Sequence, residues 1–277
     1  KAGIETSLDK NDRLLAAGKK LKIVVRMGVG YDNVDLEAAA RRGIPVCNLP
    51  GVNKEAVAEH GMMLILAVAR GLAWNHNNTV QGKWERKMRW DNAAFELPGK
   101  VMGIVGLGNT GFELAKRTHA HGMTILYNDI RPIEPEKLKA VGAAFAEKDE
   151  LFRRADVVSI NCDLNDQSRR MVDARRLALM KPTAILVCCA RGGIIDEPAL
   201  RDALNAGKLH GAGLDVFEPE PIHADNPLLS AKTVILTPHV AGVTRESLTR
   251  SYTWAHENVR RAVNDQQPKW IVNGVGK

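Results

Sequence analysis

Short apolar runs rich in Val and Ile alternate along the chain with segments whose apolar positions are spaced for a helix. Such runs predict buried strands, and their alternation with helices is typical of βαβ units around a parallel sheet. Acceptor side chains at Asp35, Asp173 and Asp196 precede apolar-periodic segments, so we expect helices to begin there. The strands are expected at residues 21–25, 44–47, 101–105, 124–127, 157–160, 184–187, 211–214 and 234–236.

A helix is expected over residues 54–70, and an irregular arm over residues 74–98 follows it. The arm contains Trp74, Trp84 and Trp90, which is more apolar area than a monomer usually leaves exposed to water. We therefore predict a homodimer that forms through residues 54–98. Packing of the three tryptophans inside the subunit is the alternative.

The composition is that of a soluble globular protein: of 277 residues, 45% are hydrophobic and 26% are charged, which is enough for two domains. The longest apolar stretch, residues 62–69, is too short to span a membrane, so a cytoplasmic protein without membrane contact is expected. The net charge is +7, but Lys and Arg are scattered, which favours a small anionic ligand over nucleic acid. The spacing of the cysteines predicts packing thiols and no metal site, for Cys47, Cys162, Cys188 and Cys189.

The expected strand at residues 101–105 runs into the pattern Gly106-x-Gly108-x-x-Gly111 and then into a helix. Gly106 permits a tight turn, Gly108 lets the backbone approach a pyrophosphate, and Gly111 lets the helix pack on the strand. The helix is expected over residues 112–121, and its N-terminal amides and dipole favour phosphate beside the turn that contains Asn109 and Thr110. This combination predicts a dinucleotide site.

An acidic residue, Asp129, ends the next expected strand, in the place from which a carboxylate accepts hydrogen bonds from the adenosine ribose. A carboxylate there repels a 2′-phosphate, so NAD is favoured over NADP. Arg131 lies two residues later and leaves NADP open.

Three loops follow the expected strands at 184–187, 211–214 and 234–236, and ligands of open α/β sheets bind at such carboxyl ends. Reduction of a 2-keto acid needs a cation for the carboxylate, a proton donor for the developing alkoxide and a hydride from the cofactor. Arg191 offers a planar, permanently charged fork, and His239 is suited to proton transfer because histidine is the side chain that commonly serves as a general acid or base. We assign Glu220 as the carboxylate partner of His239.

These loops resemble the D-isomer-specific 2-hydroxyacid dehydrogenases, and the resemblance covers essentially the whole chain. It is carried by segments 188–197, 213–221 and 237–242, by Arg26-Met27-Gly28-Val29-Gly30-Tyr31-Asp32-Asn33-Val34-Asp35, by Val57-Ala58-Glu59-His60 and by Gly82-Lys83-Trp84. The resemblance implies the roles that chemistry gives to Arg191, Glu220 and His239. It further implies that Ala190 and Asp215 bind the cofactor, Asp215 through the nicotinamide carboxamide, and that the amides of Val29 and Gly30 hold the substrate carboxylate.

The family fold implied is α/β with two Rossmann-like domains: a doubly wound, parallel-sheet NAD-binding domain inserted in a smaller, flavodoxin-like substrate domain. The substrate domain is expected at residues 1–50 and 242–277, the NAD-binding domain at 51–241. Family members carry further residues before the segment matched by Lys1 to Ile4, about two βα units, so the substrate domain is expected to be N-terminally incomplete.

The implied activity is NAD-dependent hydride transfer at C2 of a small D-2-hydroxy or 2-keto acid, such as 3-phosphoglycerate, glyoxylate or hydroxypyruvate. Formate dehydrogenases carry Gln where this chain has Glu220, which disfavours that branch. The alternative is an NAD(H)-sensing scaffold like the C-terminal-binding-protein corepressors, which keep the same Arg, Glu and His. His60 and the other histidines apart from His239 have no acid at a telling spacing and are interpreted as surface or hydrogen-bonded core residues.

Overall fold

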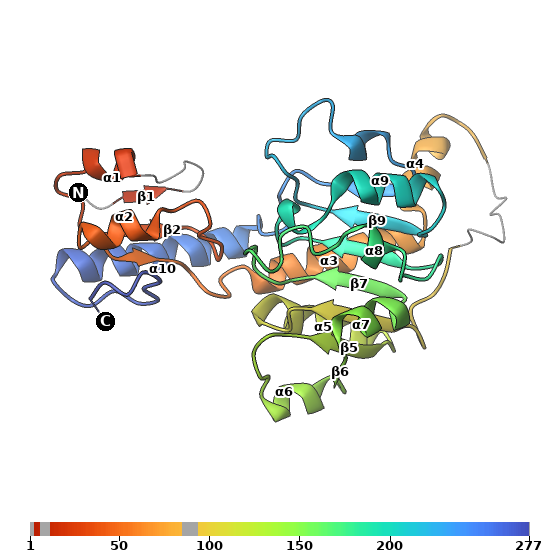
Figure 1. Ribbon diagram of the computed structural model, residues 1–277, viewed down its shortest axis with the longest axis horizontal. Coiled ribbons are helices and arrows are strands. Elements are labelled where there is room, and N and C mark those ends of the chain that lie inside the picture. The colour runs from red at the N-terminus through yellow and green to blue at the C-terminus, as the bar shows by residue number, and fades with distance from the viewer. Residues whose placement is uncertain (1–2, 6–11, 85–93, 277) are drawn as a thin grey trace. The chain divides into compact units, whose positions relative to one another are not determined.

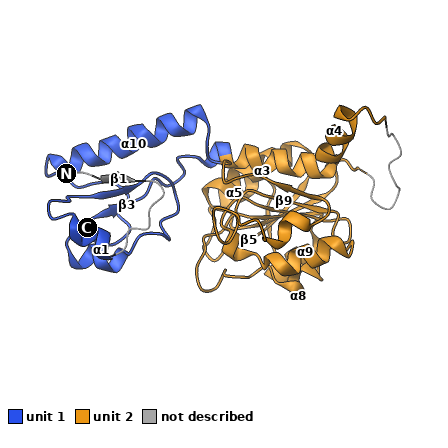
Figure 2. Cartoon of the chain, turned by 90° about the horizontal axis from the view of Figure 1, so that it is seen from above, with its two compact units in different colours: residues 1–56, 242–277 blue, residues 57–241 orange. Residues whose placement is uncertain are grey.

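The computed structural model describes residues 3–5, 12–84 and 94–276, and the chain divides into two compact units (Figure 2). One unit contains residues 1–56 and 242–277, and the other contains residues 57–241. The chain therefore crosses between the units twice. Trp90 and the rest of the predicted arm at 85–93 lie outside the described residues.

The larger unit is built around a seven-stranded sheet in which every pair of neighbouring strands is parallel (Figure 1). The strand order is β10-β9-β8-β7-β4-β5-β6, so the chain winds outward from β4 first in one direction and then in the other. This is the doubly wound α/β arrangement, and the predicted fold class is confirmed. The strands are β4 (Val101–Val105), β5 (Thr124–Asn128), β6 (Ala144–Phe145), β7 (Val157–Ile160), β8 (Ile185–Cys188), β9 (Gly211–Leu214) and β10 (Val234–Leu236).

Helices bury both faces of this sheet, which explains why its central strands are continuous apolar runs. On one face Ile104 and Val187 pack with Leu64 and Leu114, which belong to α3 and α5. On the other face the neighbouring strand residues pack against α7, α8 and α9. The helices of this unit are α3 (Lys54–Ala69, which begins in the smaller unit), α4 (Leu72–Val80), α5 (Asn109–Ala120), α6 (Pro135–Ala140), α7 (Lys148–Arg154), α8 (Ala174–Leu177) and α9 (Glu197–Asn205), with 3₁₀ turns η2 (Gly192–Ile194) and η3 (Pro227–Ser230).

The predicted helix starts at three aspartates are confirmed. The side chains of Asp35, Asp173 and Asp196 each accept a hydrogen bond from the amide three residues later, at the N-caps of α2 (Leu36–Arg41), α8 and α9. Each carboxylate satisfies an amide that the helix itself leaves unpaired.

The segment after α3 departs from the irregular arm that was predicted, because it begins with the helix α4. Gly71 adopts a positive φ of 58° and separates the two helices, which meet at 65°. Gly71 permits this break because a residue with a side chain rarely adopts that conformation. Among the described residues no single helix is long and apolar enough to cross a membrane; α3 and α4 meet that test only as a bent pair.

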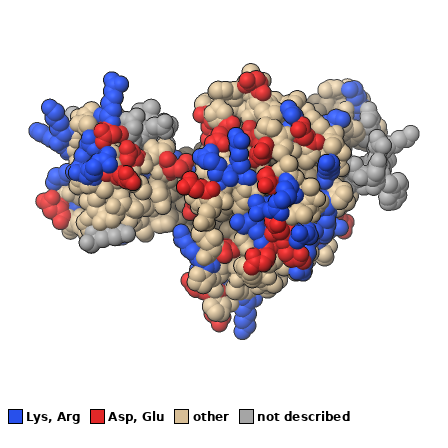
Figure 3. All heavy atoms as spheres, viewed as in Figure 1, with Lys and Arg blue, Asp and Glu red and all other residues tan. Residues whose placement is uncertain are grey.

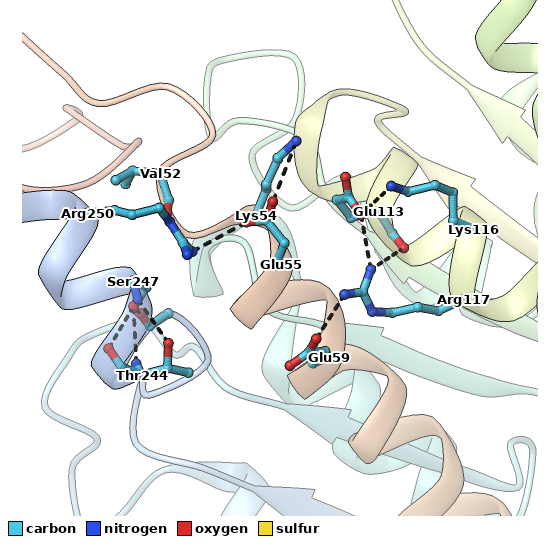
Figure 4. Close-up of polar contacts among 11 residues, drawn as sticks. Val52, Lys54, Glu55, Glu59, Glu113, Lys116, Arg117, Thr244, Ser247 and Arg250 are labelled. Atoms are coloured by element: carbon cyan, nitrogen blue, oxygen red, sulfur yellow. Dashed lines mark hydrogen bonds and ion pairs between the residues drawn. The ribbon is translucent and has the colours of Figure 1, made fainter. Parts of the chain in front are cut away.

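The smaller unit contains a three-stranded parallel sheet, β1 (Gly3–Glu5), β2 (Val24–Arg26) and β3 (Val46–Cys47), in that order. Val24 and Val46 pack on the side of α1 (Asp12–Ala17) and α2, while Val25 and Cys47 pack on the side of α10 (Arg245–Val263). Arg250 of α10 donates from Nε to the carbonyl oxygen of Val52 at 2.8 Å and lies 3.3 Å from Glu55 (Figure 4). This contact fixes the returning helix to the segment just before the first crossing.

Basic and acidic side chains are intermixed on the face of the molecule that Figure 3 shows. Ion pairs between such side chains occur in the structure: Arg175 and Arg176 both pair with Asp149. The hydrogen bond from Arg175 lowers the pKa of Asp149 to about 2. Paired charges of this kind do not form a continuous basic surface.

The cysteines act as packing residues, as predicted. Cys47 and Cys188 are buried, and burial raises the pKa of each thiol to about 12. Burial likewise raises the pKa of Cys162 to about 11. Thiols with such values stay protonated at neutral pH and behave as small apolar side chains.

Candidate active site

The glycine-rich turn connects β4 to α5 at the carboxyl end of the strand (Figure 1). Gly106 has a φ of 92°, and a Cβ there would lie 2.7 Å from the amide nitrogen of Cys162. A Cβ on Gly111 would lie 2.1 Å from the carbonyl oxygen of Gly106, so the helix can pack on the turn only without a side chain. A Cβ on Gly108 would meet no atom within 4 Å among the described residues. The turn is therefore closely packed at two glycines and open at the third.

The first turn of α5 begins at this open position, with Gly108 as N-cap and no capping hydrogen bond from a side chain of the described chain. Asn109 and Thr110 are the first two helical residues. Amides in that position have no partner within a helix, and the helix dipole favours an anion beside them. The turn therefore fits the pyrophosphate of a dinucleotide.

Asp129 follows β5 and ties that strand to the glycine turn. Its Oδ2 accepts from the amide of Leu107 at 2.8 Å, and its Oδ1 accepts from the amide of Arg131 at 2.9 Å. Each carboxylate oxygen has two lone pairs, so both oxygens retain capacity for ribose hydroxyls. The side chain is half-buried at the turn, where the sequence predicted the ribose of NAD.

Arg117 braces α5 against α3 (Figure 4). Its guanidinium lies 2.9 Å from Glu59 of α3 and 3.1 Å from Glu113 of its own helix, and Lys116 lies 2.7 Å from Glu113. Glu113 is almost completely buried, so its pair with Arg117 is less screened by solvent than a surface pair. The helix that follows the glycine turn is thereby held in place on the sheet.

The three predicted catalytic residues follow three adjacent strands. Arg191 comes three residues after β8, Glu220 six residues after β9 and His239 three residues after β10, and the sheet order β10-β9-β8 places these strands side by side. Because neighbouring strands are parallel, their carboxyl ends lie at one edge of the sheet. The strand order thus explains how residues far apart in the sequence come together.

Arg191 begins a tight turn that packs against the loop carrying Glu220. Its Nη1 donates to the carbonyl oxygen of Ala190 at 2.7 Å, and the 3₁₀ turn η2 follows directly. A Cβ on Gly192 would lie 2.0 Å from the carbonyl carbon of Phe217. The two loops can approach this closely only because residue 192 has no side chain.

Glu220 and His239 form a hydrogen-bonded pair, with Oε2 and Nδ1 2.6 Å apart. The other carboxylate oxygen accepts from the amide of Phe217 at 3.0 Å. Burial alone would raise the pKa of Glu220, but these hydrogen bonds and the charges of His239 and Arg191 together hold it below its ordinary value. Since Nδ1 is engaged with Glu220, Nε2 is the ring nitrogen that can exchange a proton with a substrate.

Asp215 is completely buried and organises the loop around His239. Its Oδ1 accepts from the Thr237 hydroxyl at 2.6 Å and from the Val240 amide at 2.9 Å, and its Oδ2 accepts from the Ala241 amide at 2.8 Å. In addition, the His239 amide donates to the carbonyl oxygen of Asp215 at 2.8 Å. The structure thus gives Asp215 a role within the chain, and its predicted contact with the nicotinamide stays a prediction.

The loop predicted to bind the substrate carboxylate belongs to the smaller unit and follows β2. Asn48, which is buried, donates from Nδ2 to the carbonyl oxygen of Val29 at 2.8 Å, and the Leu49 amide donates to the carbonyl oxygen of Gly28 at 2.9 Å. The predicted ligands at this loop are the amides of Val29 and Gly30. The carbonyl groups of the same two peptide groups, those of Gly28 and Val29, are thus fixed by residues that follow β3.

Glu197 and His60 were not predicted as site residues. Glu197 is buried, and it accepts from the Glu218 amide at 2.9 Å and from the Asn226 side chain at 2.6 Å, so it holds the loop that contains Glu220. Burial raises the pKa of Glu197 above its ordinary value. His60 hydrogen-bonds Thr237, as the interpretation of a satisfied core histidine allows, but its partner belongs to the loop of His239.

Comparison with known proteins gives the same assignment from independent information. A family model described as "D-isomer specific 2-hydroxyacid dehydrogenase, NAD binding domain" matches residues 62–241. The D-3-phosphoglycerate dehydrogenase of Archaeoglobus fulgidus is 42% identical over 234 residues, which are 84% of this chain and 44% of that protein. The glyoxylate reductase of Aeropyrum pernix is 40% identical over 264 residues, which are 94% of this chain and 78% of that protein.

A solved structure agrees with these matches. The holo form of D-mandelate dehydrogenase from Rhodotorula graminis superimposes with a TM-score of 0.91 at 31% identity, over 99% of this chain and 84% of that chain. The segment that matches the family model contains the glycine turn and the three residues predicted to be catalytic, Arg191, Glu220 and His239. The chain therefore belongs to the D-isomer specific 2-hydroxyacid dehydrogenase family, and residues 62–241 are its NAD-binding domain.

Proposed function

We propose that the protein reduces a small 2-keto acid to the D-2-hydroxy acid, or catalyses the reverse oxidation, with Arg191, Glu220 and His239 as its catalytic residues. The observation that carries the proposal is the 2.6 Å pair of His239 and Glu220, within reach of the charge of Arg191. In such an arrangement the cation can bind an anionic substrate, and the histidine, paired with a carboxylate, can protonate an oxygen of that substrate.

The chain's own residues account for the parts of the reaction other than the hydride. Arg191 binds the substrate carboxylate with its guanidinium fork, and the amides of Val29 and Gly30 are proposed as further ligands of that carboxylate. Glu220 stabilises the positive charge of the protonated His239 ring. His239 Nε2 then gives its proton to the alkoxide oxygen that develops at C2. NADH, when bound at the glycine turn, supplies the hydride to C2. The products are the hydroxy acid and NAD⁺.

The identity of the acid is proposed at the level of a small, anionic 2-keto acid. Two relatives support this class, since one is named a glyoxylate reductase and the other a D-3-phosphoglycerate dehydrogenase. Both names are those of enzymes, and nothing in the comparisons supports the corepressor-like scaffold. The chain spans 44% of the length of the D-3-phosphoglycerate dehydrogenase, so the name of that relative supports the class of substrate and does not establish the same activity for this chain.

A substrate panel tests the proposed function. Purified protein is expected to oxidise NADH in the presence of glyoxylate, hydroxypyruvate or phosphohydroxypyruvate. It is expected to prefer NADH over NADPH, because Asp129 is the carboxylate proposed to bind the adenosine ribose and would repel a 2′-phosphate. Loss of NADH absorbance gives kcat/KM for each acid. Chiral chromatography identifies the D product of hydroxypyruvate or phosphohydroxypyruvate, since glycolate, the product of glyoxylate, is achiral. Tight NADH binding without turnover of any 2-keto acid in the panel would contradict the proposal.

We further propose that two copies of the chain associate through α3 and α4. Met63 and Leu66 are exposed along one face of α3, and Leu72, Trp74 and Val80 are each at least half-exposed on α4. Several large apolar side chains exposed on two consecutive helices favour an interaction surface. The same face was predicted from the tryptophans of the arm.

Association through this face predicts that Leu72→Glu with Trp74→Glu converts a dimer to a monomer at low micromolar concentration. A charge buried at an apolar interface without a partner is strongly destabilising, so the change in mass is expected to be complete. Light scattering coupled to size exclusion measures the mass. Tyr252→Glu, at an exposed apolar residue of α10, is the matched control and is expected to leave the mass unchanged. A wild-type protein with the mass of one chain would contradict the proposal.

A further inference from the structure

A buried polar network joins α3 to the loop that carries His239. His60 Nε2 lies 2.9 Å from Thr237 Oγ1, and Thr237 Oγ1 lies 2.6 Å from Asp215 Oδ1. The side chain of Asp215 is 0% exposed and that of His60 is 14% exposed, so the network is largely shielded from water. The same carboxylate accepts from the two amides that follow His239.

The pattern of donors and acceptors fixes the direction of each hydrogen bond. An ionised carboxylate can only accept, so Thr237 donates its hydroxyl hydrogen to Asp215. The hydroxyl oxygen can then only accept from His60, which means that Nε2 of His60 carries a hydrogen. The chain of hydrogen bonds therefore runs from His60 through Thr237 to Asp215, and all three side chains have compatible roles.

The loop at the end of this network needs to be held. The backbone of His239 has a φ of 55°, a left-handed conformation that residues other than glycine rarely adopt. Such a conformation persists where surrounding contacts determine it, and here those contacts converge on Asp215. His60 also lies close to this carboxylate, with Nε2 3.5 Å from Asp215 Oδ1.

The position of His60 is itself well fixed. The preceding residue, Glu59, pairs with Arg117 of α5, and the following turns of α3 pack Leu64 and Ile65 into the core of the sheet (Figure 4). A side chain on so rigid a helix can serve as a reference point for a loop.

We propose that His60 is a positioning residue of the active site: its hydrogen bond to Thr237 holds the hydroxyl on Asp215, and the completed network sets the position of the His239 imidazole. His60 does not touch substrate or cofactor in this account. The inference rests on the proposed role of His239 and adds to it a residue from a separate helix, 177 positions away from Thr237 in the sequence.

Kinetics of four variants test the network. His60→Leu removes the hydrogen bond to Thr237, and Thr237→Val removes both hydrogen bonds of the hydroxyl, to His60 and to Asp215, each at similar side-chain volume. Each variant is expected to lower kcat for 2-keto acid reduction about tenfold, because a misplaced proton donor slows the chemical step. KM for the acid is expected to stay within about twofold, since Arg191 is untouched. The double variant is expected to lose no more than the more impaired single variant, because both changes interrupt one chain of contacts. Thr237→Ser, which keeps the hydroxyl, is expected to retain kcat.

Hydrogen exchange provides a second readout that does not depend on turnover. His60→Leu and Thr237→Val are expected to accelerate amide exchange in peptides covering residues 237–242 and to leave peptides covering the glycine turn unchanged. His210→Leu is the matched control, because it removes another partly buried histidine. The ring centroid of His210 lies 5.1 Å from that of Phe95, and His210 belongs to no part of this network. It is expected to affect neither kcat nor that loop.

The two readouts separate failure of this inference from failure of the proposed function. If the wild-type protein reduces no 2-keto acid, the proposed function is wrong, and the exchange experiment alone decides on His60. Unchanged exchange of the loop, or kinetic effects of His60→Leu and Thr237→Val that multiply in the double variant, would overturn the positioning role. If His60→Leu does not fold, unchanged exchange of the loop in Thr237→Val still overturns the positioning role, because that variant removes the hydrogen bond to His60 without any change in α3.

Discussion

Replacing Arg191 with methionine is expected to lower kcat/KM for 2-keto acid reduction about a thousandfold. Methionine preserves the length of the side chain but removes the charged fork, and losing one partner of a hydrogen-bonded charge pair costs about 4 kcal/mol, within the usual range of 2–5. A cost of that size corresponds to about a thousandfold in rate or affinity. Steady-state kinetics at saturating NADH measure the loss. NADH binding, followed by fluorescence, is expected to change by less than about twofold.

A lysine at position 191 separates charge from geometry. Arg191→Lys keeps a positive charge but offers a single ammonium in place of a planar fork, so it is expected to recover part of the loss and to remain about tenfold or more below the wild-type protein. The same variant bears on Glu220, because the charge of Arg191 helps to hold the pKa of that carboxyl below its ordinary value.

Arg169 provides the control for this experiment. Its side chain is about half-exposed and pairs with Glu218, two residues before Glu220, at 2.7 Å. Arg169→Met therefore removes a positive charge next to the same loop, but an exposed pair contributes little. Near-normal kcat/KM is expected. An equal loss in Arg169→Met and Arg191→Met would mean that general electrostatics, and not a carboxylate ligand, explains the effect.

The strands of the larger sheet could be predicted from sequence because most are buried on both faces. The predicted bounds agree with β4, β7, β9 and β10, and they differ by one residue at the ends of β5 and β8. Strand β6 was missed because it has two residues at the edge of the sheet, both exposed, and no apolar run marks it. The three-residue strand β1 was missed as well. Short edge strands are determined by the neighbour with which they pair, and no local pattern encodes that neighbour.

The helix α4 was missed for a different reason. Its sequence, LAWNHNNTV, contains three asparagines and a threonine, which have weak helix propensity, and it presents no buried residue. Gly71 before it indicates a break, but the sequence does not say whether a helix resumes. Local propensity was too weak here to outweigh the irregular appearance of the segment.

The pairing of Glu220 with His239 could be predicted, whereas most of the contacts that support it could not. The chemistry of a carboxylate and a histidine suggested the pair Glu220 and His239, which the structure places 2.6 Å apart. The contacts of Gly192 with Phe217 depend on how two loops pack, and the contact of His60 with Thr237 depends on where a helix crosses the sheet. Such contacts join residues far apart in the sequence and leave no spacing signal.

Replacing Glu220 with glutamine is expected to move the pH dependence of catalysis. The carboxyl titrates below its ordinary value of 4.5, so in the wild-type protein the carboxylate is charged throughout the range in which a histidine titrates. Glutamine keeps an acceptor for His239 Nδ1 but removes the charge that stabilises the imidazolium. Glu218→Gln is the matched control, because Glu218 pairs with Arg169 and not with His239.

In the Glu220→Gln variant the sign of the shift is the same in both directions of the reaction. Keto acid reduction requires a protonated His239, so the decline of kcat/KM at high pH is expected to begin at a lower pH in the variant than in the wild-type protein. The shift is expected to be about one pH unit or less, because the pair is partly exposed and screened. Oxidation of the hydroxy acid requires a neutral His239, so its rise is expected to begin at lower pH by the same amount. Profiles of kcat/KM between pH 5 and 10 measure both limbs. An unchanged profile, or limbs that move in opposite directions, would show that Glu220 does not act through the charge of His239.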